Sequence, residues 1–342
     1  MNSTLLSALE TAYSFSPNLP IQLAPFGEGL IHQTYQINQG DRKWILQGFN
    51  QAVFNYPERI DHNLSLLYQE AAIHPLPFKL PLPLKNSKGI GLTLIDGQTY
   101  RLFDFVEGKT LQQVENPTQA YLAAKAYGDF AAWGKAIDAG EMQETIPNFH
   151  RLDLRFEKLA QVAQTKSGLT SEEQEILDFY LSQKPLVDWY LDQIHDLPLR
   201  VTHNDTKINN LIFADDFSKV NAVIDLDTLM AGYVFYDFGD LVRTVACTEG
   251  ESSKDWEKIK VENAKYNALL EGFLEVGNGV FTEGEINSLP FGGLMMTCIM
   301  GFRFLADYLV GNIYYTIHYE EQNLHRAKNQ MCLLKGLRGL VK

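Results

Sequence analysis

The chain has 342 residues, of which 45% are hydrophobic and 21% are charged, a composition typical of a globular protein with a sizeable core. Its formal net charge of -13 argues against binding to an extended nucleic-acid backbone, which requires clustered lysines and arginines. A single nucleotide remains compatible with this charge, because one Mg²⁺ ion offsets much of the charge on its phosphates.

Neither export nor membrane insertion is predicted. The first 15 residues lack the basic start and long apolar run of a secretory signal, and they favour a short amphipathic helix. Arg303 and Asp307 interrupt the most apolar stretch, residues 289–310, which therefore predicts a buried helix and no membrane span. The three cysteines are scattered and form no disulfide or zinc pattern, so we expect a cytoplasmic protein.

Short β-rich runs dominate the chain up to about residue 107. A helix over residues 56–72 interrupts them, and the proline-rich residues 74–83 predict a loop between this helix and the next strand. The predicted strands cover residues 31–37, 44–47, 91–95 and 100–106.

After Gly108 the pattern becomes helical. Asn116 and Pro117 provide an N-cap and a first-turn proline for one long helix, and Thr170 with Glu173 forms a capping box for another. Further helices follow from about residue 251. The fold class is therefore α+β, with a small β-rich lobe of residues 1–107 and a larger, mainly helical lobe of residues 108–342.

The strongest functional signal is the pattern H-x-D-x(4)-N, formed by His203, Asp205 and Asn210 and followed by Asp225 at the end of a predicted strand. Phosphoryl transfer needs a carboxylate that accepts the proton of the attacking hydroxyl, and oxygen ligands for Mg²⁺. Asp205, Asn210 and Asp225 supply these groups. A hairpin between Asn210 and Asp225 would bring both side chains to the same edge.

At these residues the sequence resembles the aminoglycoside phosphotransferase and choline kinase superfamily. Within it, several stretches are similar to the N-acetylhexosamine 1-kinase group: GEGLIHQTYQI, WILQGF, YRLFDFVEG, THNDTKINNLIF, VIDLDTLMAGYVFYDFGDLVR and GFRFLADYL. The resemblance spans nearly the whole chain and implies a bilobal, protein-kinase-like fold with ATP and Mg²⁺ as cofactors. It further implies that Asp205 is the catalytic base, that Asn210 and Asp225 bind Mg²⁺, that His203 braces the loop, and that Asp237 is structural.

Nucleotide binding is predicted to begin at the turn containing Gly27 and Gly29, where backbone N–H groups can approach phosphates. The adenine would lie against Phe103 and Phe105, near the junction of the lobes. Kinases usually place a lysine or arginine on the third strand to bind phosphates, whereas this strand ends in Gln47, which carries no charge.

Two further cations and two polar groups are candidates near the reacting groups. Lys207 lies inside the catalytic loop, where it either meets the γ-phosphate or is a solvated surface lysine. Asp227 is predicted near the mouth of the site, where it would accept hydrogen bonds from sugar hydroxyls. Arg303 either contacts the substrate or pairs with Asp307 four residues later on the same helix face. His32 is a weaker substrate candidate.

These interpretations lead to an ATP-dependent kinase for a small molecule, an amino sugar, acting on the anomeric 1-hydroxyl of an N-acetylhexosamine. Two alternatives stay open. One is a kinase of the same fold that acts on an amino alcohol, homoserine or an aminoglycoside, and the other is an inactive nucleotide-binding pseudokinase, suggested by Gln47. No nucleic-acid or membrane partner is expected, and the oligomeric state and nucleotide preference are not determined by the sequence.

Overall fold

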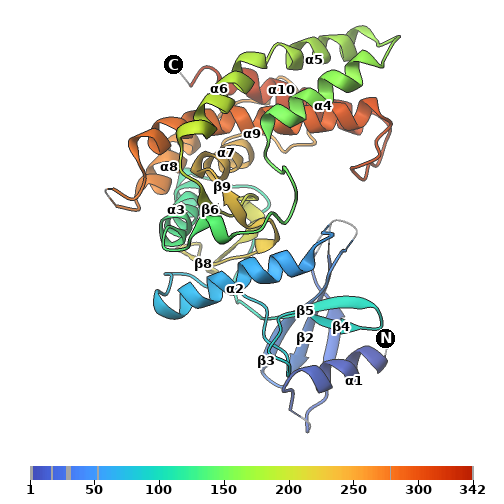
Figure 1. Cartoon of the computed structure of the whole chain (residues 1–342), viewed down its shortest axis with the longest axis vertical. Helices are drawn as coiled ribbons and strands as arrows, with labels where there is room; N and C mark the ends of the chain where they lie inside the picture. Colours follow the sequence, from blue (N-terminus) through green and yellow to red (C-terminus); the bar gives the residue numbers. More distant parts are fainter. Residues whose placement is uncertain (1–2, 17, 28–31, 52–53, 278, 341–342) are drawn as a thin grey trace.

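A computed structural model of the protein describes residues 3–16, 18–27, 32–51, 54–277 and 279–340. The chain forms a small lobe built around an antiparallel sheet and a larger, mainly helical lobe, which is the predicted α+β fold class (Figure 1).

The small lobe contains a sheet of five strands in the order β1-β2-β3-β5-β4, with all neighbours antiparallel. Its apolar core forms between one face of this sheet and helix α1, where Leu9, Trp44, Leu46 and Leu102 are buried together. The sequence patterns did not predict the first strand. The elements of this lobe are α1 (Ser3–Ala12), β1 (Gln22–Pro25), β2 (Gln33–Gln39), β3 (Arg42–Gly48), β4 (Thr93–Ile95) and β5 (Gln98–Asp104).

Helix α2 (Pro57–Ile73) lies between the sheet and the helical lobe (Figure 1). Its buried Ile60, Leu64 and Leu67 belong to the core of the large lobe and not to the core of the sheet. The side chain of Asn63 donates to the carbonyl oxygens of Gln143 and Leu229, each at 2.8 Å. The helix that interrupts the predicted strands is therefore attached to the large lobe by both apolar and polar contacts.

The large lobe is built around the long helix α9, whose buried side chains run along most of its length. By length and composition this helix could cross a membrane, but 72% of its most apolar window is buried inside the protein, as predicted for a core helix. The helices of this lobe are α3 (Pro117–Gly134), α4 (Leu152–Gln164), α5 (Ser171–Leu181), α6 (Lys184–Asp196), α7 (Val234–Val245), α8 (Asn263–Leu274), α9 (Glu283–Leu309) and α10 (Gln322–Leu337), with short 3₁₀ helices η1 (Ala139–Glu141), η2 (Ile208–Asn210) and η3 (Leu226–Thr228).

The predicted helix starts are present. The side chain of Asn116 accepts from the backbone N–H of Gln119 at the start of α3, and Thr170 with Glu173 forms a complete capping box at the start of α5. Each cap satisfies N–H groups that have no partner within the helix.

Two short antiparallel strand pairs flank the H-x-D-x(4)-N motif: β6 (Arg200–Thr202) pairs with β9 (Met230–Gly232), and β7 (Leu211–Phe213) pairs with β8 (Val220–Val223). The chain segment that connects the lobes is bonded to β7, because Lys109 and Phe213 exchange backbone hydrogen bonds of 2.9 and 2.8 Å. Gly108 precedes this contact with φ +135°, and a Cβ atom there would lie 2.1 Å from the carbonyl oxygen of Phe213. Only glycine fits this close approach.

Candidate active site

The β7–β8 hairpin brings Asn210 and Asp225 together, as the sequence spacing predicted. The backbone N–H of Ile224 donates to the carbonyl oxygen of Asn210 at 2.9 Å, which extends the hairpin by one step beyond the strands. Asp225 follows directly and has a left-handed backbone (φ 62°, ψ 58°) that non-glycine residues adopt rarely. Such a conformation is frequent at functional sites, where the surrounding structure compensates for its cost.

Asp237, in the first turn of α7, holds the loop between β6 and β7 by hydrogen bonds to its backbone. Its two carboxylate oxygens accept the backbone N–H groups of His203 at 2.8 Å and Asn204 at 2.7 Å. The Nε2–H of His203 donates to the carbonyl oxygen of Ile224 at 2.9 Å, so this buried ring ties the loop to the segment that carries Asp225. These contacts agree with the expected bracing role of His203 and structural role of Asp237.

Asp205 lies in this loop between one cation and one amide. Lys207 Nζ is 2.6 Å from its Oδ1 atom, and the Asn210 side-chain amide donates to its Oδ2 atom at 3.1 Å. Burial opposes ionisation of Asp205, but the neighbouring Lys207 outweighs it and lowers the pKa of Asp205 below its usual value. Asp205 is therefore an ionised carboxylate with a fixed orientation, which is what a proton acceptor requires. Lys207 is held inside the loop and is only half-exposed.

Asp225 has the opposite electrostatic setting. The residue is exposed to solvent, yet the surrounding protein atoms and the nearby carboxylates of Asp227 and Asp205 raise the pKa of Asp225 to about 7. A carboxylate among carboxylates is stabilised by a cation. Magnesium is usually bound by one or two protein oxygens together with substrate phosphates, and Asp225 with the amide oxygen of Asn210 fits that donor set. In the described ranges no cluster of three or more acidic, histidine or cysteine side chains offers a complete metal cage.

Asp227 lies elsewhere than predicted. It is 2% exposed, and its two carboxylate oxygens accept from the Arg101 guanidinium at 2.5 and 2.8 Å and from His32 Nε2 at 2.7 Å. The His32 ring is fixed in this orientation because its Nδ1 atom accepts the backbone N–H of Asn50 at 3.0 Å. The expectation that Asp227 opens on the mouth of the site is not met in this structure. Asp227 and His32 are hydrogen-bonded to each other, and they also bond to Arg101 and Asn50, respectively. Burial opposes ionisation here as well, but Arg101 holds the pKa of Asp227 well below its usual range.

The residues expected around the nucleotide lie on or beside the sheet. Gly27 has φ +71°, whereas Gly29 lies outside the described residues. Phe103 lies on β5, and Phe105 just after it packs edge-to-face against Phe26 with ring centroids 5.8 Å apart. Gln47 lies at the end of β3, half-buried.

Arg303 and Asp307 do not pair with each other. Asp307 accepts the backbone N–H groups of Tyr314 at 2.8 Å and Tyr315 at 3.0 Å, so it fixes the loop after α9. The Arg303 guanidinium instead lies 5.5 to 5.7 Å from the ring centroids of Phe149, Tyr314 and Tyr315. Over the part of the chain that the structure describes, no carboxylate forms an ion pair with Arg303.

His150 connects this aromatic cluster to the catalytic loop. Its Nε2–H donates to the carbonyl oxygen of Asn204 at 2.9 Å. Burial lowers the pKa of His150 to about 3. The positive charges of Arg303 and Arg155 act in the same direction, and the negative charge of Asp205 opposes them. The folded protein therefore keeps this ring neutral at every pH at which the catalytic loop is expected to work.

A pH dependence of stability follows from His150. Its pKa is roughly 6.5 in the unfolded chain, so the unfolded state binds the extra proton between about pH 6.5 and pH 3 and this contribution to stability is lost as the pH falls through that window. We expect a slope of up to about 1.4 kcal/mol per pH unit. Urea unfolding at pH 7.5 and pH 5.5 measures it, and His150→Gln should show a flatter dependence. Equal slopes in both proteins would contradict this account.

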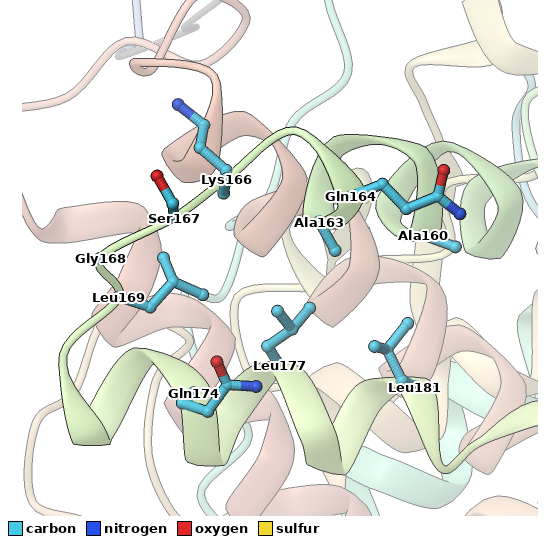
Figure 2. Close-up of a pocket in the computed structure, with 10 residues that line it drawn as sticks. All are labelled: Ala160, Ala163, Gln164, Lys166, Ser167, Gly168, Leu169, Gln174, Leu177 and Leu181. Atoms are coloured by element: carbon cyan, nitrogen blue, oxygen red, sulfur yellow. The ribbon is translucent and has the colours of Figure 1, made fainter.

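A pocket of about 390 Å³ lies between α4 and α5 on the large lobe (Figure 2). Its lining, which includes Leu169, Leu177 and Leu181, contains none of the candidate catalytic or nucleotide-binding residues. The candidate site is therefore the group around Asp205 and not this pocket.

Sequence reasoning missed Arg101, the cation that faces Asp227 and Gln47 from β5. The strand register places Arg101 directly opposite Gln47, and sequence spacing alone does not give this register. The alternation of polar Arg101 with buried Leu102 was the available signal, since it indicates that Arg101 points away from the core of the sheet.

The comparisons with known proteins agree with this architecture. An aminoglycoside phosphotransferase from Alicyclobacillus acidocaldarius superposes with a TM-score of 0.68 at 14% identity, over 98% of this chain and 96% of the other. A microcompartment-associated aminopropanol kinase gives 0.68 at 16% identity, over 99% and 98%. Spectinomycin phosphotransferase in complex with ADP and spectinomycin gives 0.56 at 10% identity, over 98% and 97%.

At these identities the structural likeness establishes the fold. The sequence itself matches the profile of the phosphotransferase enzyme family over residues 22–255, which is more than half of the chain. The protein therefore belongs to the phosphotransferase enzyme family.

Proposed function

We propose that the protein is an ATP-dependent kinase that phosphorylates a sugar hydroxyl, the anomeric 1-hydroxyl of an N-acetylhexosamine. The observation that supports this acceptor most directly is Arg303, a cation without a carboxylate partner in the described ranges and surrounded by Phe149, Tyr314 and Tyr315.

Asp205 accepts the proton of the sugar hydroxyl. Its ionised state is maintained by Lys207, and Asn210 fixes its second oxygen, so the carboxylate is already oriented before the acceptor arrives. Lys207 itself can turn from Asp205 toward the γ-phosphate and offset the charge that develops there. Asn210 and Asp225 would hold Mg²⁺, which when bound neutralises the phosphate oxygens.

The acceptor side favours a neutral sugar over an amine. Arg303 is close enough to His150 to influence its protonation, and His150 bonds to the residue next to Asp205, so the arginine lies beside the catalytic loop. Arg155 contributes a second positive charge at the same place. A cationic amino alcohol or aminoglycoside would meet repulsion here, whereas the carbonyl of an N-acetyl group accepts from a guanidinium, and sugar rings pack against aromatic faces.

The test is ATP consumption with Mg²⁺ across N-acetylglucosamine, N-acetylgalactosamine, plain hexoses, aminopropanol, choline, homoserine and an aminoglycoside, with the phosphate position read by NMR. Turnover on N-acetylhexosamines that yields the 1-phosphate is the expected result. Turnover restricted to an amine would overturn the acceptor and retain the phosphotransferase chemistry. Nucleotide binding without turnover on any acceptor would favour the pseudokinase alternative.

A further inference from the structure

Strands β3 and β5 turn one face of the sheet away from the small-lobe core, and Lys43, Gln47 and Arg101 lie on that face. Successive side chains of a strand point to opposite faces of the sheet. Since Trp44, Leu46 and Leu102 are buried in the small-lobe core, their neighbours along each strand point the other way. Gln47 and Arg101 are direct partners across the two strands, so they lie side by side on this opposite face.

Arg101 is a buried cation that has a hydrogen-bond donor without a partner among the described residues. It is only 2% exposed, and its guanidinium donates to Asp227 and, at 2.5 Å, to the side-chain oxygen of Gln47. Its Nε–H, although buried, has no hydrogen-bond acceptor among the residues that the structure describes. A buried donor without a partner is costly, and an anionic oxygen from a ligand would satisfy it.

The nearby carboxylates also favour a cation at the position of Arg101. Asp205, Asp225 and Asp227 gather here. Lys207 is paired with Asp205 and Arg101 with Asp227, while the nearby Arg243 is already paired with Asp240 and Glu251. A nucleotide adds several negative charges to this group. Gln47 brings none to offset them, and Arg101 is the cation directly beside this position, at which kinases usually have a phosphate-binding lysine.

We propose that Arg101 binds the α- and β-phosphates of the nucleotide, in place of the charge that Gln47 lacks, and that Asp227 holds its guanidinium ready. An arginine suits both contacts at once, because its planar group carries five N–H donors on three nitrogens. The inference rests on the proposed function, since it assigns a residue to the nucleotide site of that kinase. It also gives Asp227 and His32 a role in positioning Arg101.

The test separates phosphate binding from mere bracing of the two lobes. Calorimetric titration with Mg²⁺·ADP and with adenosine, which lacks phosphates, is performed on the wild type, Arg101→Gln and Arg101→Gln/Gln47→Lys. We expect Arg101→Gln to weaken ADP binding by about 10- to 100-fold and to leave adenosine binding unchanged, because one charged hydrogen-bonding group is lost. The double variant, which returns a positive charge to the neighbouring strand, should recover most of the ADP affinity.

Arg200→Gln is the matched control. It removes another arginine from a well-buried ion pair, with Glu285, outside the β3–β5 face, and it should leave the ratio of ADP to adenosine affinity at the wild-type value. If Arg101→Gln does not fold, Arg101→Lys serves instead, with an expected three- to tenfold loss for ADP alone.

Unchanged ADP affinity in the Arg101 variants, or an equal loss for ADP and adenosine, would overturn the inference and leave the proposed function intact. A wild-type protein that binds no ADP would overturn both, and this outcome is visible before any variant is measured.

Discussion

Asp205→Asn is expected to lower kcat by about 10³-fold while nucleotide affinity stays close to the wild-type value. The amide has nearly the shape of the carboxylate and its oxygen can still accept from Lys207. The hydrogen bond from Asn210 to the second oxygen is lost, but Asn210 still donates to the backbone carbonyl of Asp205 at 2.8 Å, so the loop should keep its conformation. The amide cannot accept the proton of the attacking hydroxyl, however, and this step is the one that requires a base. Steady-state kinetics with the acceptor identified in the panel, together with ADP titration, measure the two effects separately.

Asp215→Asn is the matched control for this variant. Asp215 is an exposed residue in the turn of the same β7–β8 hairpin, and its carboxylate lies 3.8 Å from Lys109 Nζ. Its replacement should leave kcat unchanged. Wild-type turnover in Asp205→Asn would show that this residue is not the base.

Asp225→Asn is expected to weaken Mg²⁺-dependent nucleotide binding by about 100-fold or more, since even replacement of groups that only orient a metal ligand typically costs 10- to 100-fold. Asparagine tolerates the left-handed backbone at this position, so the change removes charge and little else. Titration of ADP with and without EDTA measures the effect, and the variant should respond far less to EDTA than the wild type does.

The same variant should be at least as stable as the wild type in metal-free buffer at pH 8. The pKa of Asp225 is raised to about 7 in the folded protein, so its ionisation above that pH opposes folding, and a neutral side chain removes this cost. Loss of metal-dependent binding without loss of stability is the signature of a ligand that is present for function. A variant that still binds ADP much more tightly with Mg²⁺ than without it would contradict the assignment of Asp225.

The sequence allowed the fold class and the grouping of Asp205, Asn210 and Asp225 to be predicted, because both depend on local order. A hairpin necessarily returns the chain to its starting edge, so the spacing from Asn210 to Asp225 was informative without any coordinates. Helix starts at Asn116 and Thr170 were equally local, since a cap acts on N–H groups two or three residues away.

The environment of Asp227 could not be predicted in the same way. Its partners Arg101 and His32 are 126 and 195 residues away in the sequence, and they reach it only after the sheet and the catalytic loop have come together. The separation of Arg303 from Asp307 had a similar cause, because the loop after α9 supplies backbone donors that compete for the carboxylate. Spacing along one helix predicts which side chains can meet, but not which competing partner wins.

The attachment of α2 has a consequence for how the protein can be divided. Although this helix precedes the connection between the lobes, Ile60, Leu64 and Leu67 complete the apolar interior of the other lobe, and Phe49 and Phe54 join them. A fragment that starts at residue 108 would lack these side chains and leave their neighbours exposed to water. The large lobe is thus not an independently folding piece, and a fragment of residues 108–342 should be insoluble unless residues 49–73 are supplied with it.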